Sequence, residues 1–211
     1  MASDSKFLME DGTKVESKVI WGMQERSKEY FLNTFMQQII ESGDMVIGLD
    51  IKWRSGCPVN LITGSNSSFI NLDGVVLTCC TQNRCVLLGM KKYSFWLIRQ
   101  FFDNKDIIFV GVHIKDDVVT LRNCYGLIIP NAVDLSEMAV DILHQPRLRA
   151  FGARLLASEV LLEPFKARSA SMARVNWVTE ELTQEQIECA TTDAYAAFKG
   201  WQEVFASLSL N

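Results

Sequence analysis

The stretch Val46-Ile47-Gly48-Leu49-Asp50-Ile51-Lys52-Trp53 alternates large apolar residues with small or polar ones. Such alternation predicts a β-strand, in which successive side chains point to opposite faces of the sheet. The odd-numbered residues of 47–53 then pack on the core, whereas Asp50 and Lys52 share the other face. A carboxylate and an ammonium group side by side on an otherwise apolar strand are the first candidate functional groups.

Two further acids stand where a functional site of an α/β sheet is expected. Asp117 follows the apolar stretch 106–114, which predicts a strand covered on both faces, and falls in the first turn of the next helix. Asp193 lies within a predicted helix over residues 183–205, one turn after Cys189 on the same face. Acids at the carboxyl ends of strands can converge in the crevice where ligands bind. Taken singly, each acid also fits a purely structural role, such as favouring a helix N-terminus or pairing with a neighbouring cation.

The remaining pattern predicts a single α/β domain over residues 1–211. Turn signals at 11–12 (Asp-Gly) and 82–84 (Gln-Asn-Arg) each separate two strand-like runs, which predicts two hairpins. Apolar residues at helical spacing predict helices over 24–42 and 147–161, among others. Strands that come first, followed by alternating helices and strands, predict a mixed sheet flanked by helices.

Composition excludes several classes of protein. The chain is 48% hydrophobic with a net charge of only −4, which excludes a disordered chain. The longest uncharged apolar run, 107–112, is far shorter than the roughly 20 residues that span a bilayer, so no membrane partner is expected. Residues 1–6 lack the features of a signal peptide, and the six cysteines are scattered, mostly in apolar stretches. We therefore expect an intracellular, reduced protein in the nucleus, the cytoplasm or both, and not a secreted one.

Together, three stretches of the sequence resemble the motifs of the 3′–5′ exonucleases of the DEDD superfamily. The first is 46–53, and the second is Phe109-Val110-Gly111-Val112-His113-Ile114-Lys115-Asp116-Asp117 with the helix that ends in Leu121. The third comprises Asn176-Trp177, Leu182, Gln186, Ala190 and Asp193-Ala194-Tyr195-Ala196. The resemblance covers about residues 6–207 and extends to the small Werner syndrome-like exonucleases, including the plant RISC-interacting clearing exoribonucleases. It implies a ribonuclease H-like fold and metal-dependent removal of 3′-terminal nucleotides from single-stranded RNA or DNA.

The resemblance also assigns site residues. The family holds two divalent ions, Mg²⁺ or Mn²⁺, with four acids, and Asp50, Asp117 and Asp193 match three of them. Lys52 stands where the family has its fourth acid, a metal-binding Glu, and Cys189 stands where the Tyr subclass has its water-orienting phenol. A charged lysine only donates hydrogen bonds and cannot bind a metal ion. Three carboxylates and one lysine leave a net charge of −2, which predicts one ion instead of two and weakened or absent catalysis.

A basic stretch at 147–174 precedes the third motif. It carries six basic residues against two acids. The candidate nucleic-acid-binding residues within it are Arg147, Arg149, Lys166, Arg168 and Arg174. The overall pI of 5.3 argues against a general duplex-binding surface, so the expected partner is a single strand. An ordinary solvated charged face is the alternative explanation.

Three functions therefore remain open from the sequence. The first is a metal-dependent 3′–5′ exonuclease with weakened catalysis. The second is an inactive relative that binds nucleic acid or regulates an active homologue, either as a homo-oligomer or in mixed oligomers. The third is a structural interaction protein whose pocket binds nothing. No residue can be assigned to a 2′-hydroxyl contact, so RNA and DNA are not distinguished.

Overall fold

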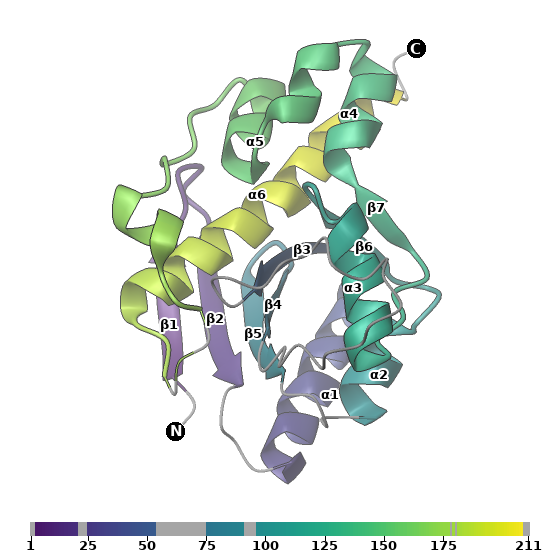
Figure 1. The fold of residues 1–211 in the computed structure, drawn as a ribbon, viewed down its shortest axis with the longest axis vertical. Helices are drawn as coiled ribbons and strands as arrows, with labels where there is room; N and C mark the ends of the chain where they lie inside the picture. The colour runs from purple at the N-terminus through teal and green to yellow at the C-terminus, as the bar shows by residue number, and fades with distance from the viewer. Residues whose placement is uncertain are drawn as a thin grey trace, which may run out of the picture.

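The computed structural model describes residues 3–20, 25–53, 75–90, 96–177, 179 and 181–208. Its strands are β1 (Ser3–Leu8), β2 (Lys14–Ile20), β3 (Val46–Trp53), β4 (Val75–Cys80), β5 (Arg84–Met90), β6 (Ile108–Gly111) and β7 (Ala132–Asp134). They form one seven-stranded sheet in the order β1-β2-β5-β4-β3-β6-β7 (Figure 1).

Helices cover both faces of this sheet. They are α1 (Glu25–Ser42), α2 (Trp96–Phe102), α3 (Lys115–Tyr125), α4 (Leu135–Leu143), α5 (Ala153–Leu161) and α6 (Gln184–Leu208), with 3-10 turns at Pro146–Ala150 and Ala170–Arg174. Residues of α1 and α2 pack on one face, and α6 runs across the other (Figure 1). The predicted mixed sheet flanked by helices is confirmed. None of the helices in the described parts of the chain is long and apolar enough to cross a membrane.

The strand pairing follows the turn chemistry of the sequence. β1 pairs antiparallel with β2, and the turn between them contains Gly12 at φ 79°, a conformation that glycine adopts without strain. β4 pairs antiparallel with β5, so both predicted hairpins are present. β3 lies between β4, to which it is antiparallel, and β6, to which it is parallel. The strand that carries Asp50 and Lys52 is therefore a central one.

The single helix predicted over 147–161 is wrong. The segment instead forms the 3-10 turn Pro146–Ala150 and then α5, separated by two residues in extended conformation. One of them, Gly152, is the N-cap of α5, and its carbonyl accepts a hydrogen bond from Leu156 N–H at 2.9 Å. The apolar spacing was compatible with one helix because Leu148 and Leu156 are both fully buried on either side of the break.

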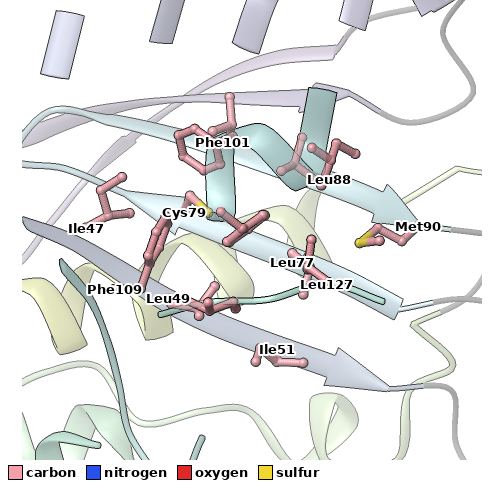
Figure 2. Packing of buried hydrophobic residues seen from close by; sticks show 14 of the residues in the cluster. Ile47, Leu49, Ile51, Leu77, Cys79, Leu88, Met90, Phe101, Phe109 and Leu127 are labelled. Carbon is pink, nitrogen blue, oxygen red and sulfur yellow. The ribbon is translucent and has the colours of Figure 1, made fainter. Parts of the chain in front are cut away.

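β3 separates two layers of the core, as its alternation predicts. Ile47, Leu49 and Ile51 pack with residues of α1 and α2 on one side of the sheet (Figure 2). On the other side, Gly48 faces α6, whose Ala194 and Phe198 are fully buried. Asp50 and Lys52 share this second face, so their side chains point toward the helix that carries the third acid.

Gly48 sets the distance between β3 and α6. A Cβ atom at this position would lie 2.0 Å from the carbonyl oxygen of Ala194 and 2.9 Å from Cβ of Phe198. Backbone atoms cannot move away from such a clash as a flexible side chain can, so only glycine fits. This close approach brings Asp193, the neighbour of Ala194, onto the sheet beside β3.

We expect Gly48→Ala to lower the free energy of unfolding by about 3 kcal/mol or more, because α6 must move off the sheet. Gly152→Ala is the control, since no atom lies within 4 Å of its added Cβ. This second change should alter stability by about 1 kcal/mol or less, through the helix cap alone. Urea unfolding of both variants measures the difference, and equal midpoints would show that the β3–α6 contact is not tight.

Candidate active site

The three acids and Lys52 come from three elements, and Asp50 and Lys52 face Asp193 on the α6 side of the sheet. Asp50 and Lys52 lie on β3, Asp117 is in the first turn of α3, and Asp193 lies within α6. The Lys52 ammonium donates to Asp50 Oδ1 at 2.7 Å and to Asp193 Oδ2 at 2.9 Å. Burial alone would lower the pKa of Lys52, but the two acids outweigh it and raise the pKa above its ordinary value. The lysine is therefore a charged donor fixed between the first and third acids.

Two arginines also bind Asp193, whose side chain is only 2% exposed. Arg154 Nε donates to Asp193 Oδ1 at 2.6 Å, and Arg168 donates to Asp193 Oδ2. Burial would raise the pKa of Asp193, but Lys52 and the two guanidinium groups more than offset it and hold the pKa at about 2. The third acid is thus an anion surrounded by three cations.

Arg154 also connects three segments around the site. It donates from Nη1 to the Lys166 carbonyl at 2.8 Å and from Nη2 to the Cys189 carbonyl at 2.9 Å. Its Nη2 also lies 3.4 Å from the Cys189 thiol. Burial raises the pKa of that thiol, so it stays neutral, 4.0 Å from Asp193. Cys189 therefore has the position predicted for it, one turn before Asp193, and its partners are an arginine and a carboxylate.

Asp117 has a different kind of partner from the other two acids. Its Oδ1 accepts a hydrogen bond from Trp53 Nε1 at 2.6 Å. Burial raises the pKa of Asp117 to about 6, although the Trp53 hydrogen bond opposes that shift. Burial also raises the pKa of Asp50 against the effect of Lys52, and Asp50 Oδ2 is a buried oxygen without a hydrogen-bond partner among the described residues.

The residues of this site do not fit a two-ion centre. Its three carboxylates and three cations have a net charge of zero when all are ionised, and the cations pair with Asp50 and Asp193. The sequence-based count of −2 left out Arg154 and Arg168, which the fold turns toward Asp193. Within the described ranges, no group of three or more His, Cys, Asp or Glu side chains is arranged to hold a metal ion. Asp50 Oδ2 and Asp117 remain as oxygen acceptors for a single cation.

Most of the residues predicted to contact nucleic acid form ion pairs with acids of the chain. Arg168 belongs to the pocket, as described above. Arg147 pairs with Glu159, Arg149 pairs with Glu137 through two hydrogen bonds of 2.9 and 2.8 Å, and Lys166 pairs with Glu188 at 2.9 Å. The side chain of Arg174 lies outside the described part of the structure. The positive charge of the stretch is thus partly neutralised, in two of these pairs by acids outside it.

Two contacts of the pocket were not expected from the sequence. Trp53 was assigned to the core face of its strand, yet its indole N–H reaches Asp117 at the strand end. Arg154 was counted only as part of a basic stretch. The excess of basic residues before the third motif was the available signal, but it does not indicate which arginine turns inward.

We expect Asp193→Asn to lower the free energy of unfolding by about 3–5 kcal/mol at neutral pH, because it leaves Lys52 and Arg154 buried without their shared anion. Asp117→Asn serves as the matched control, since an asparagine oxygen can still accept from Trp53.

The control also has a defined pH dependence. Because the native pKa of Asp117 is raised from 3.8 to about 6, the native protein holds this proton more tightly than the unfolded chain. Stability from this group is lost as pH rises through that interval, so Asp117→Asn should gain stability relative to the wild type over the same interval. Urea titrations from pH 4 to 8 test both statements, and two variants with the same loss of stability would contradict the charge distribution described here.

Known proteins that are similar in sequence to this chain include 3′–5′ exonucleases. RISC-interacting clearing 3′–5′ exoribonuclease 1 of Arabidopsis thaliana is 21% identical over 201 residues, which cover 94% of this chain and 95% of the relative. A 3′–5′ exonuclease of the same plant is 27% identical over 162 residues, covering 75% of this chain. The chain spans about half, 52%, of the length of that second relative.

A solved structure supports the fold. RNase D of Escherichia coli superimposes with a TM-score of 0.62 at 13% identity, over 85% of this chain and 43% of the enzyme. The predicted ribonuclease H-like fold is thereby confirmed.

The sequence of residues 63–208, more than half of the chain, matches the 3′–5′ exonuclease family. The resemblance read from the three motifs is confirmed, and the chain belongs to the 3′–5′ exonuclease family.

Proposed function

We propose that this chain is a non-hydrolysing member of the exonuclease family that binds the 3′ end of single-stranded RNA or DNA. One observation carries the proposal: the Lys52 ammonium lies 2.7 Å from Asp50 and 2.9 Å from Asp193. In the family pattern these two acids and a glutamate bind a metal ion. Here the same carboxylates are already bound by a cation that belongs to the protein.

The electrostatics of the pocket disfavour a divalent ion beside Asp193. At an effective dielectric constant of about 20, a divalent ion about 4 Å from one ammonium group is repelled by about 8 kcal/mol. Arg154 and Arg168 add to this repulsion, because both bind the same carboxylate. A metal ion would have to displace three hydrogen-bonded cations from a buried anion.

The same cations can receive a phosphate group. The side chain of Arg168 is 42% exposed, and the described contacts use one of its five N–H donors. A planar guanidinium matches phosphate oxygens in pairs, which suits the backbone of a nucleic acid. Arg168 therefore connects the buried cluster to solvent, and a terminal phosphodiester is the expected ligand for it.

A second candidate function is a weakened, single-ion exonuclease. It is favoured by Asp50 Oδ2, a buried oxygen without a partner among the described residues, on the same carboxylate that Lys52 binds. Asp50 and Asp117 would hold the ion, as Mg²⁺ commonly uses one or two carboxylates together with substrate phosphates. When bound, such an ion would polarise a phosphoryl oxygen. In this case Lys52 and Arg168 would orient the phosphodiester.

Binding and cleavage assays on 3′-hydroxyl single strands distinguish the two candidates. We expect anisotropy titrations with RNA or DNA to give the same affinity in EDTA and in Mg²⁺, and Arg168→Gln to weaken binding about tenfold or more, as expected for a charged contact. Arg26→Gln is the control, because Arg26 is an exposed arginine on α1, which covers the face of the sheet opposite α6. Strand shortening that requires Mg²⁺ and disappears in Asp50→Ala would establish the second candidate. If neither binding nor shortening occurs, both candidates are wrong.

Lys52→Glu tests the charge balance directly. The change gives four carboxylates against two arginines, a net charge of −2, so we expect calorimetry with Mn²⁺ to detect one site in the variant and none in the wild type. The metal-free variant should melt at a lower temperature because like charges repel, and Mn²⁺ should restore stability by binding only the native state. Lys105→Glu, an exposed site at the opposite end of β6 from Asp117, controls for the change in overall charge. One saturable ion in the wild type, lost in Asp50→Ala, would instead support the single-ion exonuclease.

A further inference from the structure

β1 is the last strand of the sheet (Figure 1), and no described strand pairs with its outer edge. Met9 N–H donates to Thr13 at 2.8 Å, which fixes the phase of the β1–β2 ladder. Since antiparallel strands alternate bonded and non-bonded pairs, Ser5 and Phe7 direct their backbone groups toward β2. The backbone N–H and C=O groups of Asp4 and Lys6 then point outward, and no described residue pairs with them.

The side chains on this edge carry alternating charge. Asp4 pairs across the hairpin with Lys18 at 2.8 Å, and Lys6 pairs with Glu16 at 2.5 Å. Both edge side chains are well exposed, Asp4 at 69% and Lys6 at 73%. Two ion pairs therefore cross from β2 to β1, and each forms a row of two charges. In one row the acid, Asp4, lies on the edge strand, and in the other row the base, Lys6, lies there.

An edge with this pattern is complementary to itself. When two copies of β1 run antiparallel, the registers that join outward-pointing groups can place Asp4 opposite Asp4, Lys6 opposite Lys6, or Asp4 opposite Lys6 of the second copy. Like charges directly opposite each other destabilise the first two registers. In the third register, Asp4 of one copy is opposite Lys6 of the other, and the two residues exchange both of their backbone hydrogen bonds. Positive and negative side chains then alternate across the four strands.

We propose that β1 pairs antiparallel with β1 of a second copy of this chain, about a two-fold axis at Ser5, and joins the two sheets into one. Charged residues on an edge strand ordinarily prevent pairing with arbitrary strands. Here they select one partner and one register. The two-fold axis is perpendicular to the sheet, so α6 of both copies lies on the same face, and with it both candidate active sites.

Charge-reversal variants of the whole chain test the interface. Sedimentation equilibrium of the wild type should give twice the chain mass of 23.9 kDa. Asp4→Lys and Lys6→Asp each replace attraction by repulsion in both pairs and should raise the dimer dissociation constant by at least about tenfold. An equimolar mixture of the two variants should dimerise again, because each Lys then faces an Asp. Lys14→Asp, an exposed position on the neighbouring strand, should leave the mass unchanged.

A backbone variant tests the strand pairing itself. Lys6→Pro removes the outward N–H and should give a monomer, since proline is tolerated on an edge but cannot donate to a ladder. Circular dichroism of each variant verifies that the fold is intact. A wild type that is monomeric at all concentrations would overturn the proposal. So would a dimer that survives Lys6→Pro, or a mixture of the two charge-reversal variants that stays monomeric.

Discussion

The hydrogen bonds from the Lys52 ammonium to Asp50 and Asp193 hold the sheet and α6 together through buried charge. A lysine at 9% exposure is stable as a cation only if its charge is paired, because burying an unpaired ion is very costly. Asp193 needs its cations for the same reason. The tight contact at Gly48 places the two groups within reach, so packing and electrostatics depend on each other at this point of the fold.

Under the proposed function, this dependence explains how an exonuclease fold can stay folded without a metal ion beside Asp193. A pocket with four acids repels itself and is stabilised by the divalent ions it binds. In this chain Lys52 stands in place of one of the four acids, and Arg154 and Arg168 add two more positive charges. The net charge of the site is therefore zero without any bound ion. Lys52 acts as a tethered counter-ion. Asp117 has no such ion pair, and burial raises its pKa to about 6 although the hydrogen bond from Trp53 opposes that shift.

The sequence predicted the strands and the acids better than it predicted their surroundings. Alternation in 46–53 and the Asp-Gly turn are local signals, and both led to the correct elements. The positions of Asp50 and Asp193 followed from motif spacing, and the structure brings them together through Lys52. The partners of Asp193 did not follow, because a long arginine side chain can point to solvent or to the core from the same backbone position. The break before α5 could not be predicted from the apolar pattern, because Leu148 and Leu156 are buried on either side of it.

The contacts of Arg154 have a consequence for how such a pocket can evolve. A lysine codon becomes a glutamate codon by a single base change, so the fourth acid of the family is mutationally close. Arg154, however, binds Asp193, the Cys189 carbonyl and the Lys166 carbonyl together, and it would remain in place after that change. In a Lys52→Glu protein, Asp193 would therefore still bind Arg154, whose positive charge continues to disfavour a metal ion there. Under the proposed function, a second change at Arg154 is needed before an acid at position 52 can serve metal binding, so the effects of the two changes are epistatic.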